Sequence, residues 1–341
     1  MNKVLPLLPC EPPLWAPDRH SQTILGEMLW SPSIRQPGRR LEVGLPDGDR
    51  VVCRLYDQDS DCVVVLFHGL AGSAQSKYMQ RVAHEFLREK YSVCLMNHRN
   101  CGEGKGLARE PYHSGKSGDL GAVIKRLRTE FPGKKIMAIG FSMSANALLL
   151  LMSRVLPGLN VFTLDEFAQA EAKHPLDLPD YAIAVNPPIN LQKTTEWFDA
   201  WSNKAYAVYF MSYLQVLIRD MDRDGLMKAP PSMSWFNSIG AFDNYFTAPV
   251  GGFKSAMEYY TNCSSRSHLT KIDRQTIILT SADDPFIDGS DFLKTDLSKD
   301  VHLHMEQVGG HMGYIHNDYT PIGSNRWLDY ALLETAKLML Y

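Results

Sequence analysis

Short runs of apolar residues alternate with segments of helical pattern along most of the chain. The runs that predict strands are Cys62–Phe67, Ser92–Asn97, Lys135–Phe141, Tyr181–Asn186, Thr276–Thr280 and Val301–Val308. The segments that predict helices are Tyr78–Glu89, Ser117–Thr129, Met143–Val155 and Trp327–Leu340. Strands that are apolar throughout are typical of a sheet buried on both faces. The alternation therefore predicts an α/β fold with a mostly parallel central sheet flanked by helices.

Three segments depart from this alternation. Residues 1–36 are rich in proline and predict an irregular N-terminal leader. Arg40–Leu45 and Arg50–Tyr56 flank Pro46-Asp47-Gly48-Asp49, which indicates a β-hairpin. Asn190–Ser264 has no strand pattern, many aromatic residues, and too great a length for an ordinary connection. We expect it to be a helical cap inserted over the carboxyl edge of the sheet, where open α/β folds bind ligands. An extra helical layer with its aromatic residues in a core explains the same pattern, and the two interpretations are compatible.

Composition narrows the class of protein. Hydrophobic residues make up 45% of the 341 residues, which excludes a largely disordered chain. Lys and Arg number 35 against 38 Asp and Glu, so the formal charge is −3 and there is no cationic excess for nucleic acid. No run of about 18 apolar residues predicts a transmembrane helix, whereas peripheral membrane contact stays open. Six scattered cysteines and the lack of a secretory signal favour the cytoplasm. Oligomeric state does not follow from composition.

The strongest local motif is Gly140-Phe141-Ser142-Met143-Ser144, between a predicted strand and a predicted helix. A sharp strand-to-helix turn exposes a serine hydroxyl above the sheet, as in the G-x-S-x-G nucleophile elbow. Small residues on both sides of the serine allow the tight turn and the close packing of helix on strand. The second glycine is Ser144 here, so the pattern is met only as G-x-S-x-S.

A nucleophilic serine needs a base and an orienting acid, because its hydroxyl is a weak nucleophile at neutral pH. In chains with this elbow the order is serine, then Asp or Glu, then His. Asp283 and Asp284 follow the strand Thr276–Thr280, and His311 lies in a glycine-rich loop after Val301–Val308. We expect Asp284 to orient His311 because it immediately precedes a proline turn, with Asp283 as the alternative.

Two backbone amides are expected to form an oxyanion hole. One is the Met143 N–H, next to Ser142, and the other is the Leu70 N–H in His68-Gly69-Leu70-Ala71-Gly72. We expect His68 itself to be a buried structural residue.

The candidate residues lie on both sides of the predicted cap, in residues 190–264. They meet in one site only if residues 1–341 form a single domain with the cap inserted. His302 and His304 alternate on one strand, but no third metal ligand is evident, and we expect both to face solvent. No metal and no organic cofactor is expected.

The motifs resemble those of the YheT-type branch of the α/β-hydrolases, which includes bacterial predicted esterases and eukaryotic α/β-hydrolase-domain lipases. The resemblance covers most of the chain. It rests on Leu14-Trp15 with His20-Ser21-Gln22-Thr23, on Phe67 to Ser73, on Asn97 to Gly102, on Tyr112 to Leu120, on Phe242-Asp243 to Tyr260, and on the segments around Asp284 and His311.

The resemblance implies an α/β-hydrolase fold and a serine carboxylesterase with Ser142 as nucleophile, Asp284 as orienter and His311 as base. Family members resemble hydrolases of short- to medium-chain or lipid-like carboxylic esters, and some transfer acyl groups to alcohols. We therefore expect a small-molecule ester substrate and an acyl-enzyme on Ser142. An acyltransferase and a non-catalytic binding protein are the alternatives.

The chain departs from the family pattern at three places. Ser144 and Ala145 replace two elbow glycines, and Asn100 replaces another glycine. The connection from Ser153 to Asp180 is also longer than is usual in the family.

Overall fold

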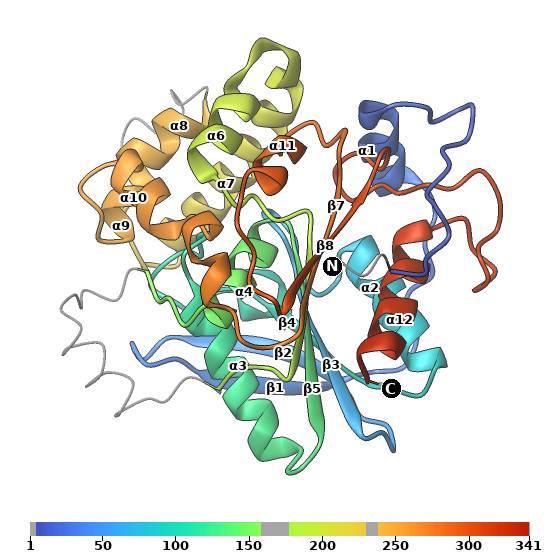
Figure 1. The fold of residues 1–341 in the computed structure, drawn as a ribbon. Helices are drawn as coiled ribbons and strands as arrows, with labels where there is room; N and C mark the ends of the chain where they lie inside the picture. Colours follow the sequence, from blue (N-terminus) through green and yellow to red (C-terminus); the bar gives the residue numbers. More distant parts are fainter. Residues whose placement is uncertain (1–4, 158–176, 230–237, 341) are drawn as a thin grey trace.

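The fold is built on one twisted sheet (Figure 1). The computed structural model of the chain describes residues 5–157, 177–229 and 238–340. Within them, eight strands are ordered β1-β2-β4-β3-β5-β6-β7-β8. The strands are β1 (Arg39–Gly44), β2 (Arg50–Tyr56), β3 (Cys62–Phe67), β4 (Ser92–Asn97), β5 (Lys135–Phe141), β6 (Tyr181–Val185), β7 (Thr276–Ser281) and β8 (Val301–Glu306). Pairing is parallel from β4 through β8, and β2 pairs antiparallel with both β1 and β4. The predicted α/β fold with a mostly parallel sheet is confirmed, as is the hairpin.

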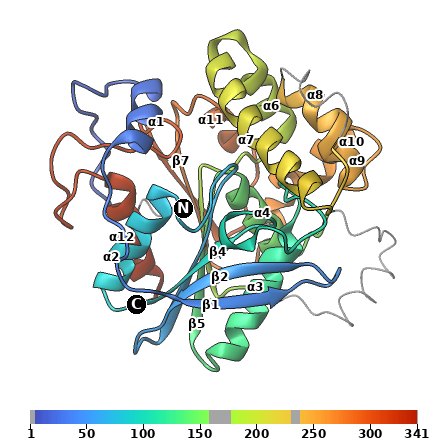
Figure 2. The same cartoon turned by 180° about the vertical axis from the view of Figure 1, so that it is seen from behind.

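Helices cover both faces of the sheet, as Figures 1 and 2 show. One face carries α2 (Lys77–Arg88) and α12 (Trp327–Leu340), and the other carries α3 (Ser117–Glu130) and α4 (Met143–Met152). Successive side chains of a strand point to opposite faces. Accordingly, Val63 and Val65 of β3 belong to the core under α3 and α4, whereas Val64 belongs to the core under α2 and α12. Burial on both faces explains why these strands are apolar throughout.

The segment that we expected to be a cap, Asn190–Ser264, contains helices and turns but no strand in its described residues. It contains α6 (Leu191–Asp199), α7 (Lys204–Arg223), α8 (Ile239–Phe242), α9 (Ala248–Val250) and α10 (Ala256–Cys263), with a 3₁₀ turn at Trp201–Asn203 and a π-helical turn at Asp243–Thr247. Residues 230–237 of this segment, and most of the connection from Ser153 to Asp180, lie outside the described residues. The remaining short elements are 3₁₀ turns at Gly102–Gly104 and Arg266–Lys271, and α11 (Gly289–Leu293).

The prediction of an irregular leader is wrong for Arg19–Met28, which forms helix α1. Asp18 caps this helix by accepting hydrogen bonds from the amides of His20 and Ser21, at 2.8 and 3.2 Å. The Ser21 hydroxyl is within hydrogen-bonding distance of the Asp18 backbone amide in return, which completes a capping box. The prolines of the leader lie before the N-cap residue Asp18 or, for Pro32, after the end of the helix, so they do not interrupt it.

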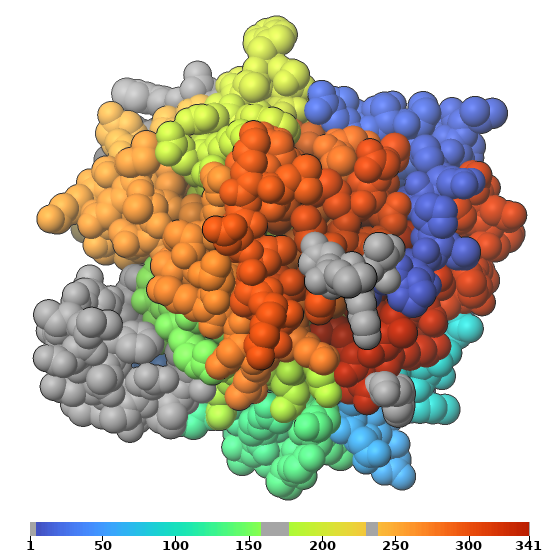
Figure 3. Space-filling view, viewed as in Figure 1, coloured from blue at the N-terminus to red at the C-terminus, as the bar shows by residue number. Residues whose placement is uncertain are grey.

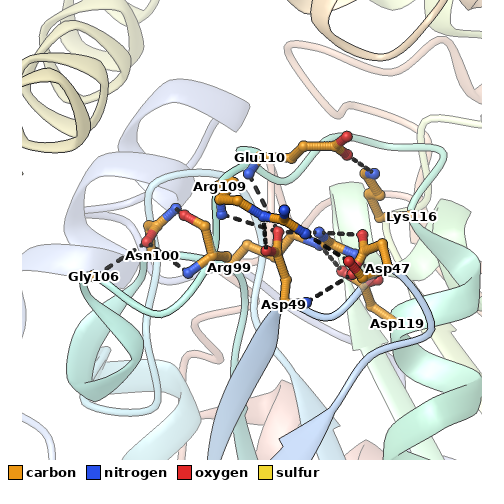
Figure 4. Close-up of polar contacts among 10 residues, drawn as sticks. Asp47, Asp49, Arg99, Asn100, Gly106, Arg109, Glu110, Lys116 and Asp119 are labelled. Atoms are coloured by element: carbon orange, nitrogen blue, oxygen red, sulfur yellow. Dashed lines mark hydrogen bonds and ion pairs between the residues drawn. The ribbon is translucent and has the colours of Figure 1, made fainter. Parts of the chain in front are cut away.

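A buried ion-pair network fastens the β1–β2 turn to α3 (Figure 4). The Arg99 guanidinium, only 2% exposed, contacts both carboxylate oxygens of Asp119 at 2.6 and 2.7 Å. It also contacts Asp49 at 2.8 Å and Asp47 at 2.7 Å. Burial alone lowers the pKa of Arg99, but the hydrogen bonds and charges of Asp119 and Asp47 outweigh burial and raise it. The guanidinium therefore keeps its charge inside the protein.

Asn100, which replaces a family glycine, follows Arg99 in the left-handed region with a φ of +58°. Asparagine tolerates this conformation better than most residues because its side chain can bond the local backbone. Here the amide donates to the Ala108 carbonyl at 2.7 Å, and the side-chain oxygen accepts from the Gly106 amide at 3.2 Å (Figure 4). The replacement therefore closes the loop between residues 100 and 108.

We predict that Arg99→Leu lowers the free energy of unfolding by about 3–5 kcal/mol, because Asp49 and Asp119 are left buried beside an apolar side chain. Arg126→Leu, which breaks an exposed pair with Glu130 one helical turn away, is the control and should cost less than about 1 kcal/mol. Urea denaturation of both variants measures the difference. Equal losses would show that the buried network does not stabilise the fold.

Candidate active site

Ser142 occupies a strained turn at the end of β5 and the start of α4. Its φ is +52° and its ψ is −118°, a combination that non-glycine residues adopt at a cost of about 1–3 kcal/mol. A Cβ at Gly140 would lie 2.6 Å from the Ser144 carbonyl oxygen, so this turn requires glycine there. The Ser142 amide donates to the Val185 carbonyl of β6 at 2.8 Å, which fixes the turn to the sheet edge.

His311 and Asp284 lie beside Ser142 in one hydrogen-bonded row. Ser142 Oγ is 2.9 Å from His311 Nε2, and His311 Nδ1 is 2.7 Å from Asp284 Oδ2. The Asp284 side chain is fully buried, and its Oδ1 accepts the amides of Phe286 and Ile287 at 2.8 and 3.2 Å. These bonds hold the carboxylate in a single orientation toward the imidazole.

Asp283, the alternative orienter, points elsewhere. One of its carboxylate oxygens accepts the amides of Gly309 and Gly310 at 3.0 and 2.9 Å. Burial raises the pKa of Asp283, an effect that the two amides oppose. Asp283 therefore holds the loop that carries His311, whereas Asp284 holds the imidazole.

Asn186, at the end of β6, also supports the site, although the sequence did not single it out. Its Nδ2 donates to Asp284 Oδ2 at 2.7 Å, and its Oδ1 accepts from the Tyr314 hydroxyl at 3.0 Å. Asn186 also has a positive φ, of 45°. The one signal in the sequence is a polar residue directly after an apolar strand.

The Leu70 amide lies between two amides that are already occupied. The Gly69 amide donates to the Tyr78 hydroxyl at 2.8 Å, and the Ala71 amide donates to the Tyr112 hydroxyl at 2.8 Å. The Leu70 amide forms no hydrogen bond with any other residue in the described part of the chain. Both Leu70 and Met143 line the same cavity as Ser142. Met143 is the first residue of α4, where backbone amides have no intrahelical acceptor.

His68 orients the Leu70 amide through the Gly69–Leu70 peptide. The His98 amide donates to His68 Nε2 at 3.1 Å, so the proton of neutral His68 is on Nδ1, which donates to the Gly69 carbonyl at 2.8 Å. Burial, helped by His98, keeps the pKa of His68 well below its usual value. In a planar trans peptide the C=O and N–H point in opposite directions. Fixing the Gly69 carbonyl therefore fixes the direction of the Leu70 N–H. The expectation that His68 is buried and structural is confirmed.

Ser144, which replaces an elbow glycine, ties α4 to this loop. Its side chain is fully buried, and its hydroxyl donates to the His68 carbonyl. His98 Nε2 lies 2.6 Å from the same hydroxyl and supplies the second hydrogen bond. Burial lowers the pKa of His98 to about 4, so its imidazole is neutral. Ala145, the other replacement, packs in the apolar core.

These groups open into a cavity of about 640 Å³ that is lined mainly by apolar side chains. The cap supplies aromatic residues, including Phe198 and Tyr206, and α1 supplies a further wall. Phe198 stacks on Phe286 at a ring distance of 4.3 Å, and Phe286 contacts the His311 ring at 4.8 Å. The lining contains two carboxyl groups, those of Glu27 and Asp243, and Asp243 is buried and accepts from the Tyr260 hydroxyl at 3.0 Å. Burial raises the pKa of Asp243 to about 6.

The expectation that His302 and His304 face solvent is wrong for both: His302 is half-buried with its Nδ1 out of contact with solvent, and His304 is half-buried as well. The His304 side chain is 13% exposed because it contacts Glu306 at 2.7 Å and stacks on Trp327. Among the described residues, no group of three or more His, Cys, Asp or Glu could hold a metal ion. In the same residues, every helix is too short or too polar to cross a membrane.

Comparison with known proteins finds one matching family and several similar proteins. The family described as the alpha/beta hydrolase fold matches residues 63–318, more than half of the chain. The Escherichia coli protein YheT, which carries an esterase name, is 27% identical over 320 residues that cover 91% of this chain and 87% of YheT. The monoacylglycerol lipase of Saccharomyces cerevisiae is 25% identical over 263 residues, which cover 76% of this chain and 56% of the lipase.

A solved structure agrees with the fold. The esterase Pf2001 of Pyrococcus furiosus superposes with a TM-score of 0.57 over 92% of this chain and 100% of that protein, at 17% sequence identity. At this identity the likeness concerns the fold alone.

We predict that Ser144→Ala lowers the free energy of unfolding by about 1–3 kcal/mol. The His68 carbonyl loses its hydroxyl donor, and His98 Nε2 keeps only a 3.2 Å contact to that carbonyl. Ser212→Ala, which removes an exposed hydroxyl bonded to the Tyr209 carbonyl, should change it by less than about 0.5 kcal/mol. Urea denaturation distinguishes the two. A loss for Ser144→Ala as small as that of the control would contradict the role of this hydroxyl.

Proposed function

Because this chain belongs to the alpha/beta hydrolase fold family, we propose that it is a serine carboxylesterase whose acyl-enzyme forms on Ser142. The relatives with esterase and lipase names support ester hydrolysis by a member of this family. The observation that carries the serine mechanism is the row of Ser142, His311 and Asp284, joined by contacts of 2.9 and 2.7 Å at the cavity.

In the proposed acylation step, His311 Nε2 takes the proton of Ser142 Oγ as this oxygen attacks the ester carbonyl. The carboxylate of Asp284 accepts the hydrogen bond of Nδ1–H, so that Nε2 of the neutral imidazole is free to act as base. The negative charge that develops on the carbonyl oxygen is stabilised by the Leu70 and Met143 amides. His311 then returns the proton to the leaving alcohol.

Deacylation repeats these steps with water. His311 removes a proton from a water molecule that attacks the acyl-enzyme, the same two amides stabilise the second oxyanion, and Ser142 recovers its proton. An alcohol that takes the place of water would give a new ester by acyl transfer. Analysis of products in the presence of ethanol therefore distinguishes hydrolysis from alcoholysis.

The cavity supports substrates with an apolar acyl or alkyl group. Its aromatic lining removes apolar surface from water, which favours binding by roughly 25 cal/mol for each Å² buried. We therefore propose small-molecule esters of short to medium chain, or lipid-like esters, as substrates. The name of the yeast relative, a monoacylglycerol lipase, is consistent with this class.

We also propose a cytoplasmic location. All six cysteines are buried free thiols, as is common where glutathione keeps thiols reduced. Fractionation of cells that express the chain tests this location, and recovery in an extracellular or periplasmic fraction would contradict it.

We predict that Ser142→Ala lowers kcat by about 10⁴- to 10⁶-fold on p-nitrophenyl esters, because only binding and oxyanion stabilisation remain. The assay uses a series of acyl chains from acetate to dodecanoate, and Ser212→Ala is the control with unchanged activity. A fluorophosphonate should label the wild type on Ser142, identified by peptide mass spectrometry. Ester hydrolysis by Ser142→Ala above background would rule out the mechanism, and a rate maximum at acetate would argue against lipid-like substrates.

We further predict that Asp284→Asn lowers kcat by about 10⁴-fold, because an asparagine amide favours the wrong imidazole tautomer. Asp283→Asn weakens the acceptor of two loop amides, so we expect lower stability and a much smaller loss of kcat, within about tenfold. Steady-state kinetics and thermal unfolding of both variants separate the two roles. A larger kcat loss for Asp283→Asn would reverse the assignment.

A further inference from the structure

The loop that carries His311 has an unusual backbone. Gly310, Met312 and Tyr314 have φ values of +57°, +64° and +41°. Positive φ angles in non-glycine residues cost energy and persist only where the surroundings hold them. The position of His311 therefore depends on what contacts this loop from outside.

Two residues of helix α1, Thr23 and Gln22, contact this loop, and neither takes part in the proposed reaction. The His311 amide donates to Thr23 Oγ1 at 2.9 Å, and the same hydroxyl donates to the Arg19 carbonyl at 2.6 Å. Thr23 is thereby fixed to its own helix while it accepts the amide of His311. The hydroxyl therefore donates one hydrogen bond, to the Arg19 carbonyl, and accepts one, from the His311 amide.

Gln22 holds the other end of the same loop. Its side chain is fully buried, Oε1 accepts from the Ile315 amide at 2.6 Å, and Nε2 donates to the Ile315 carbonyl at 3.1 Å. Nε2 also donates to the Ala16 carbonyl at 2.8 Å. Gln22 and Thr23 together hold residues 311–315 at both ends.

The helix and the loop approach each other backbone to backbone. A Cβ at Gly26 would lie 2.7 Å from Gly313 Cα, and a Cβ at Gly310 would lie 2.5 Å from the Arg19 carbonyl oxygen. Glycine on each side is what allows this approach. In the space-filling view the N-terminal segment, in blue, lies directly against the orange-red C-terminal part of the chain (Figure 3).

Helix α1 also reaches the cavity and the cap. Thr23, Ile24 and Met28 line the cavity that contains Ser142. His20 Nδ1 lies 3.1 Å from the hydroxyl of Tyr206, on cap helix α7. The helix therefore contacts the histidine loop, the cavity and the cap at the same time.

We propose that α1 is a working part of the active site, in which Thr23 is a positioning residue for His311. The Thr23 hydroxyl sets the orientation of the His311 peptide, and through it the distance from the imidazole to Ser142. Misplacement of a catalytic group by about 1 Å costs up to about 100-fold in rate. This inference rests on the proposed role of His311.

The experiment compares Thr23→Val, which keeps the shape but removes the hydroxyl, with Thr23→Ser, which keeps the hydroxyl. Thr129→Val is the matched control, because Thr129 makes the same hydroxyl bond to the carbonyl four residues earlier in α3, at 3.3 Å, without a loop amide. Thr23→Val should lower kcat by about 10- to 100-fold with KM changed by less than about twofold. Thr23→Ser and Thr129→Val should stay within about threefold of the wild-type kcat.

A second readout needs no substrate. The proton between His311 Nδ1 and Asp284 gives a downfield resonance in the proton NMR spectrum, assigned by its loss in Asp284→Asn. In Thr23→Val this resonance should shift or broaden, whereas in Thr23→Ser and Thr129→Val it should persist. Circular dichroism establishes that each variant is folded, and Thr23→Ala replaces Thr23→Val if the latter is not.

The outcomes separate this inference from the proposed function. Wild-type kcat and resonance in folded Thr23→Val, or an equal loss in Thr23→Ser, would overturn the role of the hydroxyl. A lower unfolding temperature with an unchanged resonance and unchanged kcat would make Thr23 a structural residue only, and would overturn it too. If the chain hydrolyses no ester at all, the resonance still reports whether Thr23 orients His311.

Discussion

The hydrogen-bond ladder of the parallel strands β5 to β8 is the constraint on which the site depends. In this ladder Phe141 pairs with Val185, Val185 with Leu279, and Ser281 with Glu306, so β5 and β6 end level with each other and β7 and β8 end together two residues farther along. Parallel strands place the residues that follow them at the same edge of the sheet. Ser142 and His311, 169 positions apart in the chain, meet because of this ladder. The cap and α1 close a cavity over an edge that the sheet has already arranged.

Around the loop His68–Gly72 at this edge, orientation comes from neutral, buried hydrogen bonds. His68 and His98 are uncharged: both ring nitrogens of His68 bond backbone groups, and Nε2 of His98 bonds the Ser144 hydroxyl. Such bonds are stronger in a low dielectric, and an unmade one is costly there, so a buried network holds a single geometry. The charged network around Arg99 begins at the residue after His98, and the Arg99 charge adds to burial in lowering the pKa of His98.

The sequence predicted the sheet well because strands buried on both faces are apolar throughout, as in Cys62–Phe67. It also predicted which residues follow the strand ends, and Ser142, Asp284 and His311 were found in this way, although their roles stay proposals. It did not predict α1, because the prolines before Asp18 masked the capping box. It did not predict the functions of Asn186 or Thr23 either. Their partners, Asp284 and His311, are distant in the chain, and no local pattern reports a contact of that range.

The contact between Thr23 and His311 spans 288 positions. During synthesis Thr23 therefore leaves the ribosome long before its partner exists, and this contact of α1 cannot form until the loop after β8 has been made. An isolated helix of 10 residues is marginal in water, so α1 gains its stability at the end of folding. The contact that places the histidine therefore needs most of the chain to be present. A nascent chain that ends before His311 contains Ser142 but neither its base nor the partner of Thr23, so the proposed site can assemble only after synthesis has passed residue 311.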